Sequence, residues 1–198
     1  MKHLVFFLYL FTFSTYTLAG SPNHNEGDKS LNFNFNEFDV DGYKYGIGGK
    51  YWYASNTAIT ASLNIAKNKQ EVETTMGSPT PTGFDAETTS YGLSLSIEKH
   101  FKSKTSVSPY YGGEVYYSES DSDGSDSSSI ATSDSQSWGI NALLGAEYAF
   151  TDSLAFAAEY AWGYHMSEYE SSNNTGTSKN SFKGFGFFDT KLILLLYF

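Results

Sequence analysis

Large apolar residues alternate with small or polar residues along most of this chain, and the alternation defines its predicted strands. In LAFAAEYAWGYHM, residues 154–166, the even positions are mostly large and apolar, whereas the odd positions hold alanine, glutamate, glycine and histidine. The run SWGINALLGAEYAF, residues 137–150, follows the same rule. A period of two residues indicates a strand with two chemically different faces, so both runs are predicted as strands despite the helix propensity of alanine and glutamate.

The same alternation recurs along the chain and is interrupted by turns and polar stretches. It predicts eight strands, at about residues 30–38, 43–54, 58–72, 88–101, 108–119, 136–150, 154–167 and 182–198. Short connections at about 55–57, 102–107 and 151–153 alternate with long ones at 73–87, 120–135 and 168–181, and the short connection 39–42 belongs to the second series. This asymmetry is typical of an eight-stranded antiparallel up-and-down transmembrane β-barrel, with short periplasmic turns and longer surface loops.

The period alone does not decide which face of the barrel points outward, because a soluble ligand-binding barrel places its apolar face inside. The polar face here holds mainly glycine, serine, alanine and asparagine, which fit the crowded interior of an eight-stranded barrel. Aromatic residues fall near many strand ends, as in the girdles of transmembrane barrels; these are Tyr43, Tyr53, Phe101, Tyr117, Trp138, Phe150, Tyr164, Phe182 and Phe198. We therefore expect the apolar face to meet lipid.

Charged residues on the predicted inner face nearly balance one another. They are Lys44, Lys50, Lys183 and Lys191 on one side and Glu98, Glu114, Glu147, Glu159 and Asp189 on the other. An isolated buried charge is costly, so opposite charges in a poorly hydrated lumen should pair. We predict a charged and polar network that fills the lumen.

The overall charge excludes one class of partner. The chain of 198 residues has a formal net charge of −10, contributed mostly by the predicted connections, and it has no arginine. An acidic chain repels phosphate backbones, and the bidentate arginine contacts common in base recognition are missing, so nucleic-acid binding is not expected. The absence of cysteine excludes disulfides, a thiolate metal site and an acylated cysteine after a signal peptide.

Residues 1–20, MKHLVFFLYLFTFSTYTLAG, have the pattern of a secretory signal peptide. Lys2 precedes an apolar stretch from Leu4 to Phe13, and the small residues Thr17 and Ala19 follow it. We predict cleavage after Ala19, with an uncleaved anchor helix as the alternative. Residues 20–29 would then form a short periplasmic segment and residues 30–198 the barrel, in which no window approaches the length of a transmembrane helix.

The carboxyl-terminal run LILLLYF ends on an aromatic residue, and Leu194, Leu196 and Phe198 share one face of the last predicted strand. This pattern resembles the sorting signal of bacterial outer-membrane proteins, which the barrel-assembly machinery recognises. With the signal peptide and the eight strands, the chain resembles the small-barrel family that includes OmpX-like and opacity-type proteins and the membrane domain of OmpA-like proteins. The resemblance covers residues 30–198 and implies a bacterial outer-membrane location, with membrane lipid and lipopolysaccharide as neighbours.

Two motifs offer candidate chemistry. Asp121, Asp123 and Asp126 surround a glycine and could offer oxygen ligands to Ca²⁺, but the glutamate expected at the twelfth loop position is replaced by Thr132. A solvated acidic loop is therefore the preferred interpretation, and no metal or other cofactor is expected.

The second motif is a His-x-Ser pair, His165 and Ser167, with Glu168 or Glu170 nearby. It resembles the pair of barrel-type lipid A deacylases and suggests a triad. By parity both residues face the lumen, however, and those enzymes act on lipid outside the wall. We expect a non-enzymatic protein with a structural or surface-interaction role through acidic extracellular loops; the alternatives are a narrow porin-like channel and a lipid A-modifying hydrolase.

Overall fold

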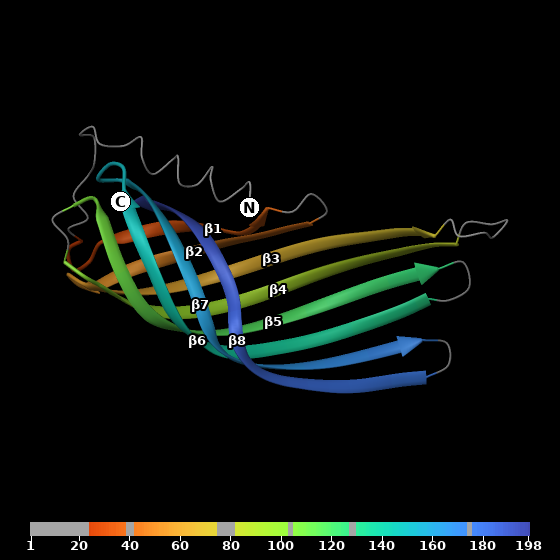
Figure 1. Cartoon of the computed structure of the whole chain (residues 1–198). Coiled ribbons are helices and arrows are strands. Elements are labelled where there is room, and N and C mark those ends of the chain that lie inside the picture. Colours follow the sequence, from red (N-terminus) through yellow and green to blue (C-terminus); the bar gives the residue numbers. More distant parts are fainter. Residues whose placement is uncertain (1–23, 39–41, 75–81, 103–104, 127–129, 174–175) are drawn as a thin grey trace.

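A computed structural model describes residues 24–38, 42–74, 82–102, 105–126, 130–173 and 176–198 of the chain. These residues form eight antiparallel strands, each hydrogen-bonded to the next, which close into one barrel (Figure 1). The strands are β1 (Lys29–Phe38), β2 (Gly42–Ala54), β3 (Thr57–Thr74), β4 (Thr82–His100), β5 (Val107–Asp126), β6 (Ile130–Ala149), β7 (Leu154–Asn173) and β8 (Gly176–Tyr197). The predicted fold class is confirmed. Within the described residues, no helix has the length and apolar character needed to cross a membrane.

The barrel closes where the first and last strands meet. Six residue pairs join β1 to β8, from Ser30 opposite Tyr197 to Phe35 opposite Leu192. The β7–β8 pairing is much longer and runs from Leu154 opposite Leu196 to Asn173 opposite Gly176. The closing seam is therefore the least extensively paired junction in the wall.

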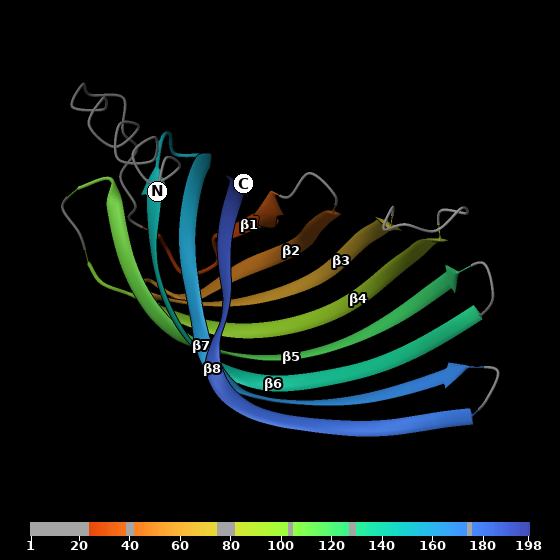
Figure 2. The same ribbon diagram turned by 45° about the vertical axis from the view of Figure 1, so that its right-hand side comes forward.

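Beyond the barrel, β3 to β8 continue as paired strands far past the ends of β1 and β2. Figure 2 shows these extensions as a curved trough, open on the side where β1 and β2 stop. The short turns and the carboxyl terminus lie at the opposite end, which is the periplasmic end in barrels of this kind. We therefore expect the trough to be the extracellular part of the protein.

The predicted extent of the three long connections is wrong. Most of 73–87, 120–135 and 168–181 belongs to regular hairpins that pair in register, for example Ser120 with Ser135 and Glu170 with Lys179. Hydroxyl side chains join neighbouring strands there, with Ser90 and Ser120 oxygens 2.6 Å apart. Strands with two polar, solvated faces carry no hydrophobic alternation, so the pattern that found the barrel could not reveal them.

The outer face of the barrel is apolar and the inner face is small or polar. The outer side chains of Leu144 and Leu63 are 65% and 59% exposed in the isolated chain, whereas their neighbours Leu143 and Ser62 on the inner face are buried. An apolar surface this large on every strand requires a lipid environment. The expected orientation of the two faces therefore matches the structure.

Glycines on the inner face make room for large rings. A β-carbon added to Gly145 would collide with the ring of Tyr110, which fills the lumen at this level. Trp52, a bulky residue among small ones in the β2 pattern, is also fully buried inside the barrel. The interior is therefore a packed core of rings and charged groups.

Candidate functional site

The lower, periplasmic half of the lumen is organised around Lys50 of β2. Its Nζ lies 2.7 Å from Glu98 Oε2 of β4 and 3.4 Å from Glu147 Oε2 of β6. All three side chains are at most 3% exposed. One ammonium group thus joins two carboxylates from different strands, which offsets part of the cost of burying each charge.

Neutral groups complete the hydrogen bonding of these carboxylates. Thr60 Oγ1 donates to Glu98 Oε1 at 2.9 Å, and Tyr197 Oη donates to Glu147 Oε1 at 2.8 Å. His100 lies between Glu98, at 3.3 Å, and Ser108, at 3.0 Å. The lower cluster is consequently a fixed network rather than a set of solvated charges.

A second cluster lies around Lys191 of β8. Its Nζ lies 2.7 Å from Glu114 Oε2 of β5 and 3.4 Å from Glu159 Oε1 of β7. Asn141 donates to the other oxygen of Glu114 at 3.1 Å. Because β5 and β8 are not neighbours in the sheet, the Lys191–Glu114 contact crosses the lumen.

Tyr110 connects the two clusters. Its hydroxyl donates to Glu159 Oε2 at 3.1 Å, and the Lys50 Nζ lies 5.5 Å from the centroid of its ring. A cation over an aromatic face is favourable, more so where water is excluded. The charged and aromatic groups therefore form one continuous arrangement across the barrel.

A cavity of about 210 Å³ opens above the second cluster. Lys44 lines it together with Lys191, Glu114, Asn141 and Tyr116. The structure thus brings six predicted lumen residues into the two clusters and places Lys44 beside them. The side chain of Asp189 lies outside the described residues.

The placement of Lys183 is a correction to the predicted network. Counting back by twos from the end of β8 puts Lys183 inside, but β8 contains a bulge: Ala161 pairs with Asp189, whereas Trp162 pairs with Phe187. One extra residue reverses the faces of the strand beyond it. Lys183 therefore pairs with outward-facing Met166 and is exposed on the outer face, while Phe182 turns to the inner face against His165.

Above the barrel, the two faces of the trough differ in chemistry. Inner positions carry hydroxyl groups, such as Ser118, Ser120 and Ser135, whereas outer positions carry charges. On the outer face, Glu87 contacts Lys67 and lies 3.4 Å from Lys69. Hydrogen bonding from Lys67 is the largest cause of the lowered pKa of Glu87. The outer face of the trough therefore carries solvent-exposed charged side chains that form ion pairs with one another.

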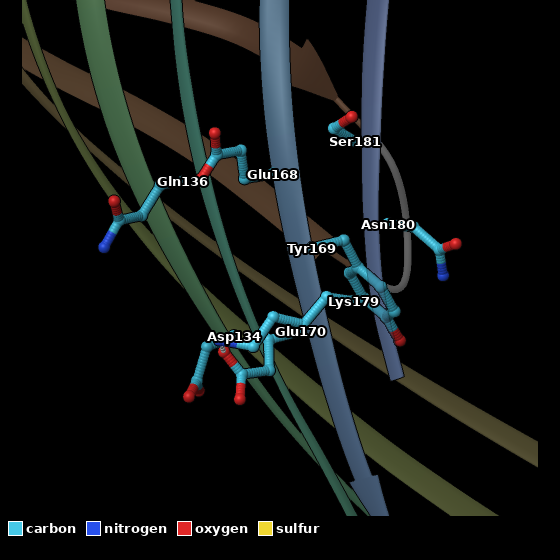
Figure 3. A pocket seen from close by; sticks show the side chains of 8 residues that line it. All are labelled: Asp134, Gln136, Glu168, Tyr169, Glu170, Lys179, Asn180 and Ser181. Atoms are coloured by element: carbon cyan, nitrogen blue, oxygen red, sulfur yellow. Dashed lines mark ion pairs between the residues drawn. The ribbon is translucent and has the colours of Figure 1, made fainter. Parts of the chain in front are cut away.

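A shallow hollow of about 380 Å³ lies on β6, β7 and β8 of the trough. Figure 3 shows Glu170, Lys179 and Asp134 gathered on one side of these strands. The ion pair between Lys179 Nζ and Glu170 Oε2 measures 2.7 Å, and its hydrogen bond raises the pKa of Lys179. The hollow is polar, exposed and open to solvent.

The architecture and the sequence together identify the family. A family model described as "Outer membrane protein beta-barrel domain" matches residues 5–187. The chain belongs to this family. The resemblance to small outer-membrane barrels is thereby confirmed, as is the location in the bacterial outer membrane.

Solved structures of outer-membrane barrels align with most of this chain. A major outer membrane protein from Thermus thermophilus has a TM-score of 0.58 and 11% identity, over 87% of this chain and 99% of that chain. Neisserial surface protein A has a TM-score of 0.43 and 20% identity, over 86% and 95% of the two chains. The N-terminal β-barrel domain of Pseudomonas aeruginosa OprF has a TM-score of 0.47 and 14% identity, over 88% and 100%. No curated protein matches in sequence.

In this outer-membrane barrel, the candidate calcium residues lie on a strand rather than in a loop. Asp121 and Asp123 are exposed on the outer face of β5, and the side chain of Asp126 lies outside the described residues. Among the described residues, no three histidine or carboxylate groups converge in a way that could hold a metal ion.

The candidate triad does not assemble. His165 and Ser167 are on the inner face of β7, where their strand partners are Gly184 and Phe182. Glu168 pairs with Ser181 and lies on the outer face with Glu170, because successive residues of a strand point to opposite sides. Neither glutamate is placed to orient His165.

The carboxyl-terminal residues of the barrel occupy the lipid side of the periplasmic rim. Phe198 is exposed, Leu196 is partly exposed, and Leu194 packs on the same face. The amide of Phe198 donates to the Lys29 carbonyl at 3.1 Å and extends the closing seam by one bond. Recognition of this end by the assembly machinery remains a prediction.

The sequence reasoning gave no role to His24, as it gave none to Tyr110 or Tyr197. His24 precedes β1 in a polar segment, and its ring lies inside the periplasmic mouth, 3.8 Å from Trp52 between ring centroids. Nothing in the alternation marks it, since it belongs to no strand.

Proposed function

We propose that this outer-membrane protein acts through its extracellular trough, as a surface-interaction protein, and that its filled lumen serves to keep the barrel rigid. The proposal rests on the contrast between the buried lumen of the barrel and the exposed strands of the trough. The lumen residues Lys50, Trp52 and Glu147 are almost fully buried, whereas the six extracellular strands expose two large polar faces. Binding sites on a rigid barrel usually lie on such projecting elements.

The register of the β5–β6 hairpin allows a direct test. Ser120 pairs with Ser135, so replacing residues 120–135 by an Asn-Gly turn removes one hairpin tip while leaving the barrel pairs unchanged. Cells displaying the shortened protein should lose attachment to other cells or to coated surfaces, while the purified barrel still shows its heat-dependent shift in electrophoresis. Attachment equal to that of the full-length protein would contradict a role for this hairpin.

The outer face just above the membrane supports a second contact, with lipopolysaccharide. Lys183 precedes Phe185 by two residues on β8, and the Phe185 ring is exposed on the lipid side, so we expect the Lys183 ammonium group to lie near the outer-leaflet phosphates. Acidic neighbours such as Glu168 can join phosphates through divalent cations. Lipid and lipopolysaccharide are thus the proposed partners of the wall.

Lys99 provides the matched control for this contact. It is also exposed on the outer face, but it lies at the periplasmic end of β4, away from the lipopolysaccharide leaflet. We expect Lys183→Ala to reduce the lipopolysaccharide that copurifies with the protein, and Lys99→Ala to leave it unchanged. Equal retention in both variants would refute the assignment of Lys183.

Planar-bilayer recording separates this function from a narrow channel. The ionic clusters and the buried rings occupy the lumen, so we expect no steady conductance from the purified protein. Stable openings that change when Glu147 or Lys191 is substituted would favour the channel instead. Loss of acyl chains from lipopolysaccharide on expression, abolished by Ser167→Ala, would favour the hydrolase.

A further inference from the structure

The chain preceding β1 turns back into the periplasmic mouth of the barrel. Gly27 donates its amide to the Trp52 carbonyl at 2.8 Å, and the Trp52 amide donates to the Asp28 carbonyl at 3.0 Å. Asn25 donates its amide to the Asp28 carboxylate at 2.7 Å, which closes a tight turn. Gly27 has a φ of +96°, a conformation that favours glycine and directs the preceding residue inward.

This turn places His24 among side chains from the two strands that flank β1. Its ring stacks on Trp52 of β2, with the planes 14° apart, and its centroid lies 4.9 Å from that of Tyr197 on β8. Its Nε2 lies 3.1 Å from Glu147 Oε1 of β6. Only 9% of the His24 side chain is exposed.

Charged and aromatic groups from four strands lie around His24. The groups around it are Lys50 on β2, Glu98 and His100 on β4, Glu147 on β6, and Tyr197 on β8. The two carboxylates of the lower cluster share a single lysine. His24 brings its Nε2 beside the Glu147 carboxylate, and its flat ring covers Trp52.

We propose that residues 24–28 form a clasp that seals the periplasmic mouth and ties β2, β6 and β8 together across the β1–β8 closing seam. The seam needs such support because only six residue pairs join β1 to β8. The segment belongs to the same chain, and its contacts join it to β2, β6 and β8. It depends on neither the extracellular partner nor the proposed surface function.

Trp52 can report on the clasp. The other two tryptophans, Trp138 and Trp162, lie on the lipid face, so Trp138→Phe with Trp162→Phe leaves Trp52 as the only indole. In the folded protein, its fluorescence should be blue-shifted and protected from the aqueous quencher acrylamide. A Trp52 that is quenched as readily as in the unfolded chain would overturn the proposal without any further variant.

Changes at His24 in this single-tryptophan protein test the contact itself. His24→Ala should increase quenching of Trp52 and shift its emission to the red, whereas Asn25→Ala, at an exposed neighbour that uses only its backbone, should do neither. His24→Phe should keep the protection, because it retains the stacked ring, but lower the temperature of the electrophoretic unfolding shift. If His24→Ala and Asn25→Ala behave alike in both measurements, the segment is not a clasp.

Discussion

Lys191 on β8 reaches across the lumen to Glu114 on β5, and the two charged groups meet at 2.7 Å. Glu159, the strand partner of Lys191, lies 3.4 Å from the same ammonium group. Carboxylates of β5 and β7 therefore share one ammonium group. The Lys191–Glu114 contact connects β5 and β8, which are not neighbours in the sheet.

Removing Lys191 should strongly destabilise the barrel. In Lys191→Met, Glu114 and Glu159 remain buried without their shared cation, and breaking a buried ion pair from one side costs about 3–5 kcal/mol. The measurement is urea-induced unfolding in lipid vesicles. Lys183→Met is the matched control: it removes a lysine from the same strand on the outer face and should change the free energy of unfolding far less.

A side chain at position 145 should destabilise the barrel, because the Tyr110 ring lies against Gly145. Gly145→Val places atoms where the Tyr110 ring lies, and such overpacking costs about 1–3 kcal/mol. Gly49→Val serves as the control, because a β-carbon at Gly49 meets nothing closer than 3.9 Å. A combined Gly145→Val and Tyr110→Ala protein should lose less stability than the two single changes predict. Strict additivity would show that the two residues do not compete for space.

Glu87 on the extracellular trough should titrate below the usual range for glutamate. Its pKa is lowered chiefly by the hydrogen bond from Lys67 and to a smaller extent by Lys69. Because the folded pKa is the lower one, any stabilisation is present above the ordinary glutamate pKa and is lost as the pH falls through the folded value. NMR titration of the Glu87 carboxyl should show that Lys67→Ala raises its pKa toward the ordinary glutamate value more than Lys69→Ala does.

Phe198 should matter for assembly more than for stability. It is largely exposed at the periplasmic rim, so Phe198→Ala removes little buried surface. We expect less folded protein in the outer membrane of cells but normal refolding of the purified chain into detergent. Phe150→Ala, which truncates another exposed ring near the same rim, should leave both unchanged. Equal losses for the two variants would contradict a terminal sorting signal.

The sequence predicted the barrel because lipid imposes a strict pattern on the wall. Each strand between Leu31 and Leu196 must present apolar side chains to hydrocarbon and small or polar ones to the lumen, and this alternation is visible residue by residue. The same parity placed Lys50, Glu98, Glu114, Glu147, Glu159 and Lys191 on the inner face, where the structure shows them in contact.

The alternation of inner and outer residues predicted the wrong face where β8 contains a bulge. The bulge lies between Asp189, the partner of Ala161, and Phe187, the partner of Trp162. It places Lys183 on the outer face and Phe182 on the inner face, and no residue type in this stretch of β8 predicts it. The strands of the extracellular hairpins were not predicted for another reason. Both of their faces are in water, so neighbouring residues such as Ser120 and Asp121 are both polar and show no hydrophobic alternation.

The sequence by itself thus determined the number of strands, their up-and-down order and which face meets lipid, since hydrocarbon tolerates only one pattern. Tertiary structure alone decided which charges meet, because Lys191 and Glu114 are 77 residues apart and are brought together only by closure of the barrel. It also decided the place of His24, a residue outside every strand, because its partners Trp52, Glu147 and Tyr197 form one pocket only when the ring of strands is complete.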